Sequence, residues 1–293
     1  MTGAERGFLL LTSHLGNPER KPLTPAQMRT LRQRAAMLSW EDRDLTEKDL
    51  LLLGYSREMA TRILALLSEE ALLDYTLIQG RRQDCCPISR VNGHYPEILS
   101  HRLGPDAPGC LWAKGDITLL RTTAISLVGS RQLREPNRAF AVAVGQYAAR
   151  QNLTLISGNA RGADRTAQEA CLASGGNVIS IVADELSKQP LQEHILYLSE
   201  EDFDAPFTTQ RALSRNRLIH ALGAMVFVAQ SDVGTGGTWS GCTQNLRHGW
   251  SPVICFRDGS AAAQALEDLG AYLIREEELG EFRAISGDEI SFF

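Results

Sequence analysis

Three glycine-rich segments of this sequence combine small residues with arginine or free backbone donors, a pattern that suits anion binding. They read Gly129-Ser130-Arg131, Ser157-Gly158-Asn159-Ala160-Arg161-Gly162-Ala163-Asp164 and Gly234-Thr235-Gly236-Gly237-Thr238. Glycine lets the backbone approach an anion closely, and free N–H groups at a helix start favour negative charge. Arginine adds a planar fork of donors that matches phosphate oxygens. The expected chemistry is recognition of phosphate groups.

A fourth segment, Ser214-Arg215-Asn216-Arg217, opens a helix predicted over 213–222. The leucine and isoleucine side chains of this helix predict a buried side, so both arginines are expected to point outward. For this pair, as for each glycine-rich segment taken alone, the alternative is a solvated arginine on an ordinary turn or helix face. Recurrence of the pattern after three strands favours a shared phosphate site.

The sequence lacks the familiar nucleotide fingerprints. It contains no GxxxxGK[ST] run, and the residues from Gly129 onward do not form GxGxxG. The six cysteines have no zinc-ligand spacing, and the six histidines form no i,i+4 pair. Asp184 and Glu185 follow a predicted strand, where a capped turn explains them better than a cation site. We expect neither a metal nor an organic cofactor.

The elements that must hold these segments alternate between strand and helix. Apolar runs predict strands over 124–128, 153–156, 178–182, 225–229 and 253–256, with helices over 136–151, 163–173, 213–222 and 238–248. This alternation predicts an α/β fold with a doubly wound, Rossmann-like parallel sheet. Such sheets bind ligands at the carboxyl ends of their strands, which is where the three glycine-rich segments fall.

The residues before this sheet have helical patterns. Thr24, Thr46 and Ser56 can each cap an amphipathic helix, and Leu53-Gly54-Tyr55 joins the second of these helices to the third. The pair resembles a helix-hairpin-helix or SAM-like unit. We predict a helical SAM-like domain over 1–82 and a Rossmann-like domain with an acidic C-terminal tail over 83–293. Residues 80–115, rich in proline and glycine, are predicted to form an irregular connector.

The charge of the chain argues against a protein that coats nucleic acid. Its 293 residues carry a net charge of -5, and 43% of them are hydrophobic, as in a globular protein. From Asp258 onward there are nine acidic and two basic residues out of 35 and 30 in the whole chain, so the part before is slightly basic. Glu276-Glu277-Glu278 is expected to be a solvated surface, or alternatively a protein-binding or autoinhibitory strip.

Compartment and membrane association follow from composition. The apolar run Phe8–Leu11 is too short for a signal segment or a membrane span. Cys171 and Cys255 lie in apolar stretches typical of small buried residues. The chain is predicted to be reduced and cytoplasmic, with no membrane partner.

Five motifs in fixed order resemble the DprA/Smf (DNA-processing protein A) family. They are Tyr-Pro-x-x-Leu at 95–99, Leu-Trp-Ala-Lys-Gly at 111–115, Gly-Ser-Arg at 129–131, Ser-Gly-x-Ala-Arg-Gly-x-Asp at 157–164 and Arg-Asn-Arg-x-Ile at 215–219. The resemblance covers roughly 85–257 and implies a Rossmann-like fold in the superfamily that also holds the LOG phosphoribohydrolases. The chain departs from the residues usual in that family at Ala163, Ala167-Gln168 and Trp239, which is typical of a divergent member.

This resemblance implies a DNA-processing protein that binds single-stranded DNA through backbone phosphates, without catalysis, in support of recombination or of DNA uptake or defence. Members help to load a recombinase and often dimerise, so a recombinase and a second copy are the implied protein partners. By position, the pocket residues are Gly129, Ser130, Arg131, Ser157, Gly158, Arg161, Gly162, Asp164, Arg215, Asn216, Arg217, Gly236, Gly237 and Thr238. Trp239 is expected either to stack on a base or to pack as a core indole.

The alternative function is sensing of a small nucleotide in the manner of the LOG superfamily. LOG enzymes use a glutamate three residues after the threonine of their glycine-rich loop. Counted from Thr238, that position is Gly241, which cannot do acid–base chemistry. The chain is therefore predicted not to be an enzyme, and nucleotide binding would occur without turnover.

Overall fold

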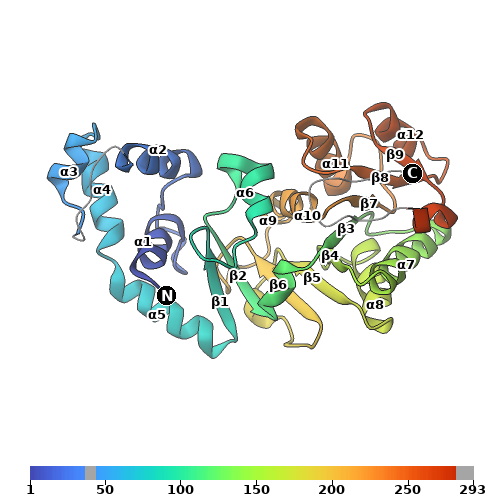
Figure 1. Ribbon diagram of the computed structural model, residues 1–293, viewed down its shortest axis with the longest axis horizontal. Helices are drawn as coiled ribbons and strands as arrows, with labels where there is room; N and C mark the ends of the chain where they lie inside the picture. The colour runs from blue at the N-terminus through green and yellow to red at the C-terminus, as the bar shows by residue number, and fades with distance from the viewer. Residues whose placement is uncertain (37–43, 282–293) are drawn as a thin grey trace.

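One large sheet forms the centre of the protein (Figure 1). The computed structural model describes residues 1–36 and 44–281, and within them the sheet has nine strands in the order β1-β2-β6-β5-β4-β3-β7-β8-β9. The strands are β1 (Cys85–Ser89), β2 (Cys110–Gly115), β3 (Ala124–Val128), β4 (Thr154–Ser157), β5 (Asn177–Ile181), β6 (Ile195–Ser199), β7 (Val226–Val228), β8 (Val253–Phe256) and β9 (Tyr272–Ile274). Strands β3 to β9 are parallel, and β2 and β1 add antiparallel pairs at one edge. The predicted α/β, Rossmann-like fold class is confirmed.

Helices cover both faces of this sheet (Figure 1). Every residue of β3 is buried, with Ile125 and Leu127 in one core cluster and Ala124 and Val128 in the other. Burial on both faces explains why the strand is a continuous apolar run. The first cluster includes side chains of α7 (Glu135–Arg150) and α8 (Ala163–Ala173). The second includes side chains of α6 (Glu97–Leu103), α10 (Asn216–Leu222), α11 (Gly236–His248) and α12 (Ala261–Asp268).

The strand order reverses beside β3. From β3 the chain moves outward through β4, β5 and β6, and it then returns to place β7 on the opposite side of β3. Loops that leave β3 and β7 at such a reversal diverge to opposite faces and open a crevice between them. The sheet thus has one position at which loops from three strands can surround a ligand.

Helices α1 (Gly3–Thr12), α2 (Pro25–Ala35), α3 (Glu47–Leu52), α4 (Arg57–Leu67) and α5 (Glu70–Arg82) precede the sheet. Thr24, Thr46 and Ser56 cap α2, α3 and α4 as predicted, each accepting an N–H bond. Helices α1 to α4 share a small core, but α1 and α5 also bury leucines in the cluster under the sheet. The division at residue 82 therefore stays a prediction. None of the described helices has the length and apolar character needed to cross a membrane.

The prediction of an irregular connector over 80–115 is wrong. Strand β1, helix α6 and strand β2 occupy half of that range. Pro87 lies in β1, which is an edge strand, so its missing N–H removes no bond from the interior of the sheet. The Tyr95 hydroxyl donates to the Pro108 carbonyl at 2.7 Å and holds the turn before α6. Proline and glycine therefore mark turns between short elements here.

The acidic tail is folded as far as Glu281. It forms α12, β9 and the 3-10 helix η4 (Glu276–Glu281), and it buries Ile274 and Leu279 in the cluster under the sheet. Glu276 and Glu277 are exposed on η4. The remainder of the predicted tail, 282–293, lies outside the described residues.

Candidate phosphate-binding site

The three glycine-rich segments meet at the carboxyl ends of β3, β4 and β7. The Ala163 N–H donates to the Ser130 carbonyl at 3.1 Å, which joins the segment after β4 to the segment after β3. The Ser130 N–H donates to the Gln230 carbonyl at 3.0 Å, which adds the chain that leaves β7. These backbone bonds lie at the reversal of strand order, so the topology of the sheet brings the loops together.

Glycine is required where these loops touch. A Cβ at position 129 would lie 2.6 Å from the Ala163 Cβ. At Gly162 the φ angle is +91°, and a Cβ there would lie 2.5 Å from the Ser130 carbonyl oxygen. Both distances are shorter than van der Waals contact, so the glycines of the predicted site are needed to pack the loops as well as to expose backbone to a ligand.

Arg215 lies buried between these loops, contrary to the predicted outward orientation. The helix predicted over 213–222 is divided into α9 (Thr209–Ser214) and α10. Arg215 is the residue at the division, and it is 7% exposed. Its guanidinium covers Gly158, where a Cβ would lie 1.5 Å from Nη1. The division of the helix thus allows the arginine to turn toward the ends of the strands.

Asp164 provides the nearest negative charge to Arg215. Its Oδ2 lies 3.8 Å from Arg215 Nη2 and accepts the Ala160 N–H at 3.2 Å. Burial raises the pKa of Asp164, and the neighbouring Arg215 charge opposes that rise. Burial also lowers the pKa of Arg215, but a guanidinium keeps its charge at neutral pH. Within the described residues the buried Arg215 Nε has no hydrogen-bond partner.

Three neighbouring cavities lie along the glycine-rich loops, and all of them are lined by Arg131. The largest, of about 660 Å³, lies between the loops after β3 and β7 and the start of α10. A second, of about 240 Å³, lies between the loop after β4 and α9. A third, of about 510 Å³, lies over the N-terminal turns of α7 and α8. The exposed Arg131 lines all three cavities, and Arg215 lines the first two.

Most of the predicted site residues are brought together here. Those that line one or more of the three cavities are Gly129, Ser130, Arg131, Gly158, Arg161, Gly162, Asp164, Arg215, Asn216, Gly236, Gly237 and Thr238. Ser157 is fully buried at the end of β4, beneath them. The Asn216 amide donates to the Gly237 carbonyl at 3.1 Å and ties α10 to the start of α11.

Arg217 and Trp239 lie apart from these cavities. Arg217 Nη2 donates to Glu200 Oε2 at 2.6 Å, and its other terminal nitrogen donates to the Asp106 carbonyl. Its guanidinium is therefore already paired and faces a different hollow of the surface. Trp239 is partly buried and packs against the second core cluster. Of the two expectations for Trp239, this placement fits the packed indole.

Phe207 and His220 also line the cavities and were not among the predicted site residues. Phe207 is 52% exposed and lines the 240 Å³ cavity with Arg131 and Arg161. His220 is fully buried and lines the 660 Å³ cavity. A lone phenylalanine in a polar stretch and a lone histidine in an apolar helix carry no signal of their own, because both depend on tertiary contacts.

The described residues contain no cluster of three or more His, Cys, Asp or Glu side chains that could hold a metal ion. Asp184 lines the 240 Å³ cavity but accepts the Gln189 amide at 3.3 Å. Gln189 Oε1 in turn accepts the Asn159 amide at 3.2 Å. Asp184 thus takes part in a hydrogen-bonded turn, as the preferred interpretation predicts.

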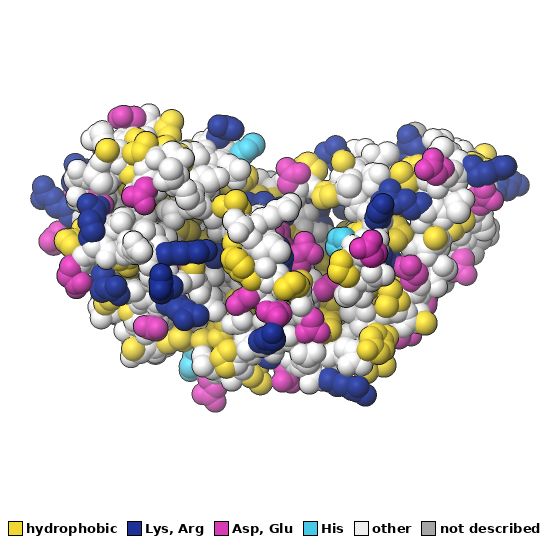
Figure 2. All heavy atoms as spheres, turned by 180° about the vertical axis from the view of Figure 1, so that it is seen from behind, with side chains coloured by type: hydrophobic (Ala, Val, Ile, Leu, Met, Phe, Trp, Pro, Cys, Tyr) yellow, Lys and Arg dark blue, Asp and Glu magenta, His cyan; other side chains and the backbone are white. Residues whose placement is uncertain are grey.

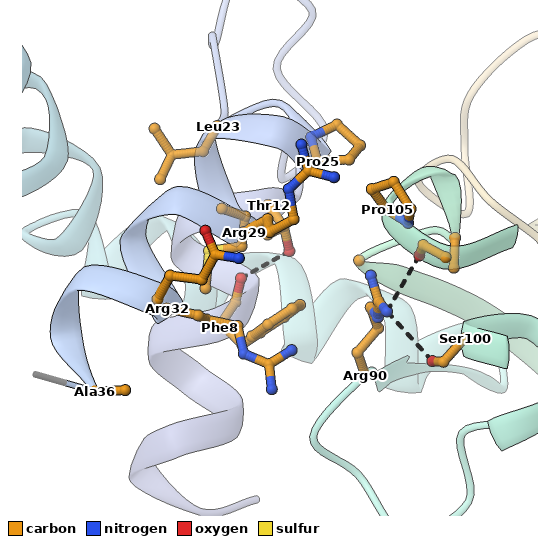
Figure 3. A pocket seen from close by; sticks show the side chains of 15 residues that line it. Phe8, Thr12, Leu23, Pro25, Arg29, Arg32, Ala36, Arg90, Ser100 and Pro105 are labelled. Carbon is orange, nitrogen blue, oxygen red and sulfur yellow. Dashed lines mark hydrogen bonds between the residues drawn. The ribbon is translucent and has the colours of Figure 1, made fainter.

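A separate arginine-lined cavity of about 520 Å³ lies between α2 and the segment around α6. Figure 3 shows Arg29 and Arg32 reaching it from α2, while Arg90 faces them from the opposite side. Arg90 Nη2 is held at 3.3 Å from Ser100 Oγ and 3.4 Å from the Gly104 carbonyl. Elsewhere, the face seen in Figure 2 carries basic and acidic side chains interspersed.

Comparison with known proteins identifies relatives. A family model described as DNA recombination-mediator protein A matches residues 87–279. The DNA processing protein DprA of Streptococcus pneumoniae is 31% identical over 152 residues, which are 48% of this chain and 53% of that protein. Protein Smf of Escherichia coli is 26% identical over 152 residues, covering 48% of this chain and 40% of that protein. The match thus spans about half of these relatives or less, and it confirms the resemblance to the DprA/Smf family.

Solved structures support the fold. The X-ray structure of DNA processing protein A from Streptococcus pneumoniae has a TM-score of 0.75 and 24% identity, covering 97% of this chain and 100% of that one. A structure of DNA processing protein A from Helicobacter pylori, which concerns the single-stranded DNA binding mode of that protein, has a TM-score of 0.55 and 22% identity. It covers 64% of this chain and 90% of that one. At these identities the likeness bears on the fold alone.

Proposed function

This chain belongs to the DNA recombination-mediator protein A family, and we propose that it binds single-stranded DNA through backbone phosphates without altering the strand chemically. The observation that carries the proposal is the convergence of three glycine-rich loops on the buried Arg215, with the exposed Arg131 at the rim. The single-stranded DNA binding mode described for the Helicobacter pylori protein supports it.

The two arginines suit different parts of a phosphate interaction. Arg215 is held rigidly by burial, and its Nη2 lies 3.8 Å from Asp164 Oδ2, so little of its side-chain freedom is lost when it binds an anion. Arg131 is exposed and makes no hydrogen bond or ion pair with any described residue. It can therefore follow successive phosphates. Contacts of this kind position a strand but do not specify its sequence.

An exposed aromatic ring at the site supports a single strand as the ligand. Phe207 lines the same cavity as Arg131 and Arg161 and is 52% exposed. The bases of a single strand can stack on such a ring, which contributes about 1–3 kcal/mol per base. In this proposal Phe207, and not Trp239, is the ring on which a base stacks.

Fluorescence anisotropy with a labelled 20-nucleotide oligo-dT tests the proposal. We expect saturable binding at micromolar protein in 50 mM salt. Affinity should fall steeply toward 200 mM salt, because each neutralised phosphate of a single strand adds about -0.7 to the slope of log K against log salt. Absence of binding at 50 mM salt, or binding that salt does not weaken, would contradict the proposal.

The alternative, binding of a small nucleotide without turnover, is supported by the size of the cavity of about 660 Å³. The position of the LOG glutamate is Gly241 in this chain. A larger residue would not fit there without a shift, because even a Cβ would lie only 2.7 Å from His220 Nε2. Calorimetry with mononucleotides and dinucleotides distinguishes the two functions. Tight saturable binding of one of them, with no binding of the oligonucleotide, would favour the sensor.

The proposed role in the cell is to support recombination, DNA uptake or defence. The proposed protein partners are a recombinase and a second copy of this chain. These roles rest on the family to which the chain belongs. A competition between the recombinase and a single-strand-binding protein on the same oligonucleotide, with and without this protein, would test the first of them.

A further inference from the structure

His220 is a fully buried side chain that the phosphate site does not use. It lies on α10 and lines the 660 Å³ cavity, with its imidazole beside the first half of α11. A buried ring nitrogen without a partner is uncommon, because burial removes the water that would otherwise satisfy it. The hydrogen bonds around the imidazole show which of its two nitrogens lacks a partner.

The protonation state of the ring follows from Asn245 and Ser251. The Ser251 N–H donates to Asn245 Oδ1 at 2.9 Å, which fixes the orientation of the amide. Asn245 Nδ2 must then donate, and it lies 3.1 Å from His220 Nδ1. Nδ1 therefore accepts, and the single proton of the neutral ring is on Nε2. Burial lowers the pKa of His220 to about 3, so the ring is neutral at physiological pH.

The Nε2–H group of His220 has no acceptor among the described residues. Gly241 lets the backbone of α11 approach it closely, because a Cβ there would lie 2.7 Å from Nε2. The Ser231 hydroxyl, 8% exposed, lines the same cavity and also lacks a partner within the described chain. Two buried polar groups without partners at one cavity indicate a ligand that supplies polar atoms.

The chemistry of these groups favours an uncharged ligand atom. A neutral imidazole N–H and a hydroxyl suit a carbonyl oxygen, whereas the guanidinium of Arg215 at the same cavity suits a phosphate. A nucleotide presents both kinds of group, with a phosphate at one end and a base at the other. The cavity can thus separate the two ends, with the phosphate at the arginines and the base beside His220.

We propose that the 660 Å³ cavity receives one base of the bound strand and that His220 Nε2–H donates to a carbonyl oxygen of that base. The inference rests on the proposed function and adds a base preference to it. Thymine, cytosine and guanine carry such an oxygen, but adenine does not. The protein should therefore discriminate against adenine at one nucleotide of its binding site.

The test compares oligo-dT with oligo-dA on wild-type protein and on His220→Phe by fluorescence anisotropy. Phenylalanine keeps a ring of similar size but removes the donor. We expect the preference for oligo-dT over oligo-dA to fall by about 2- to 10-fold in the variant, the range of one neutral hydrogen bond, with oligo-dA affinity unchanged. The measured quantity is the ratio of oligo-dT affinity to oligo-dA affinity, compared between wild type and variant. Differences in stiffness between the two strands affect both proteins equally and therefore cancel.

A second variant guards against misfolding of the first. Gly241→Ala retains the histidine but places a methyl group in the space beside Nε2, and it should reduce the same preference. His248→Phe is the matched control, because His248 is exposed and stacks on Trp250 with a centroid distance of 5.2 Å. An unchanged ratio in folded His220→Phe or Gly241→Ala protein would overturn the inference. Failure of the proposed function would instead appear as loss of salt-sensitive binding to both strands.

Discussion

Two regions of this protein present arginines to a cavity, and they are built differently. At the carboxyl ends of β3, β4 and β7, Arg215 is buried and lies directly over Gly158. The loops that leave these three strands surround it. Between α2 and α6, Arg29 and Arg32 are exposed on the face of one helix, beside a lining that includes Phe8 and Leu23 (Figure 3). The first region has fixed its donors before any ligand arrives, but the second has not.

The difference shows that the number of arginines in a cavity does not define an anion site. A long flexible side chain must lose its rotamer freedom on binding, which costs about 0.5–1.5 kcal/mol. Arg215 has already lost that freedom on folding, whereas Arg29 and Arg32 have not. The site at the carboxyl ends of the strands should therefore bind phosphate, and the α2 cavity should contribute little. Substitutions in both regions can test that ranking.

Arg215→Gln should have the largest effect. Loss of a hydrogen bond to a charged group costs about 1.5–3 kcal/mol, so oligonucleotide affinity should fall by about 10- to 100-fold. The variant also leaves Asp164 buried without its nearest cation, at 3.8 Å in the wild type, and should melt at a lower temperature. Anisotropy measures the first change and circular dichroism the second.

Arg217→Gln is the matched control for this substitution. The two arginines are separated by one residue, but Arg217 is already paired with Glu200 at 2.6 Å. Its replacement should change affinity far less. Equal losses in the two variants would mean that the burial of Arg215 has no special role in binding.

Gly158→Ala should have the next largest effect, although it removes no polar atom. The added methyl group would lie 1.5 Å from Arg215 Nη1 and must displace the guanidinium. We expect affinity to fall by about 10-fold, close to the lower limit for removing the arginine itself. Gly7→Ala, where no atom lies within 4 Å of the new Cβ, should leave binding unchanged. Wild-type affinity in Gly158→Ala would show that the position of the guanidinium over the strand end is not needed.

The sequence predicted the parts of this site that depend on the backbone. Continuous apolar runs identified β3, β4, β5, β7 and β8, and glycine after three of them located the loops. Parallel strands end at the same edge, so the convergence of the loops followed from the fold class. These features depend on local periodicity, which a single sequence displays.

The side-chain arrangement was predicted less well, because it depends on contacts between distant segments. Leu213 was assigned to the buried side of one continuous helix, but it is 49% exposed, and the helix is divided at Arg215. Arg217 found a partner in Glu200, whose position depends on the end of β6. The short strands β1 and β2 at the antiparallel edge were missed because the prolines and glycines within and around them outweighed their few apolar residues.

The smallest expected effects distinguish the two arginine-lined regions directly. Arg131→Gln removes one exposed phosphate contact, so affinity should fall by about 3- to 10-fold and the salt slope should lose about one contact. The double variant Arg29→Gln, Arg32→Gln removes two exposed charges from the α2 cavity, but we expect a change of less than about 2-fold, because those side chains are not positioned by burial. Anisotropy titrations at several salt concentrations measure both quantities. If the double variant instead lowers the salt slope as much as Arg131→Gln or more, the strand also crosses α2, and the contrast between a prepositioned site and a solvated one would fail.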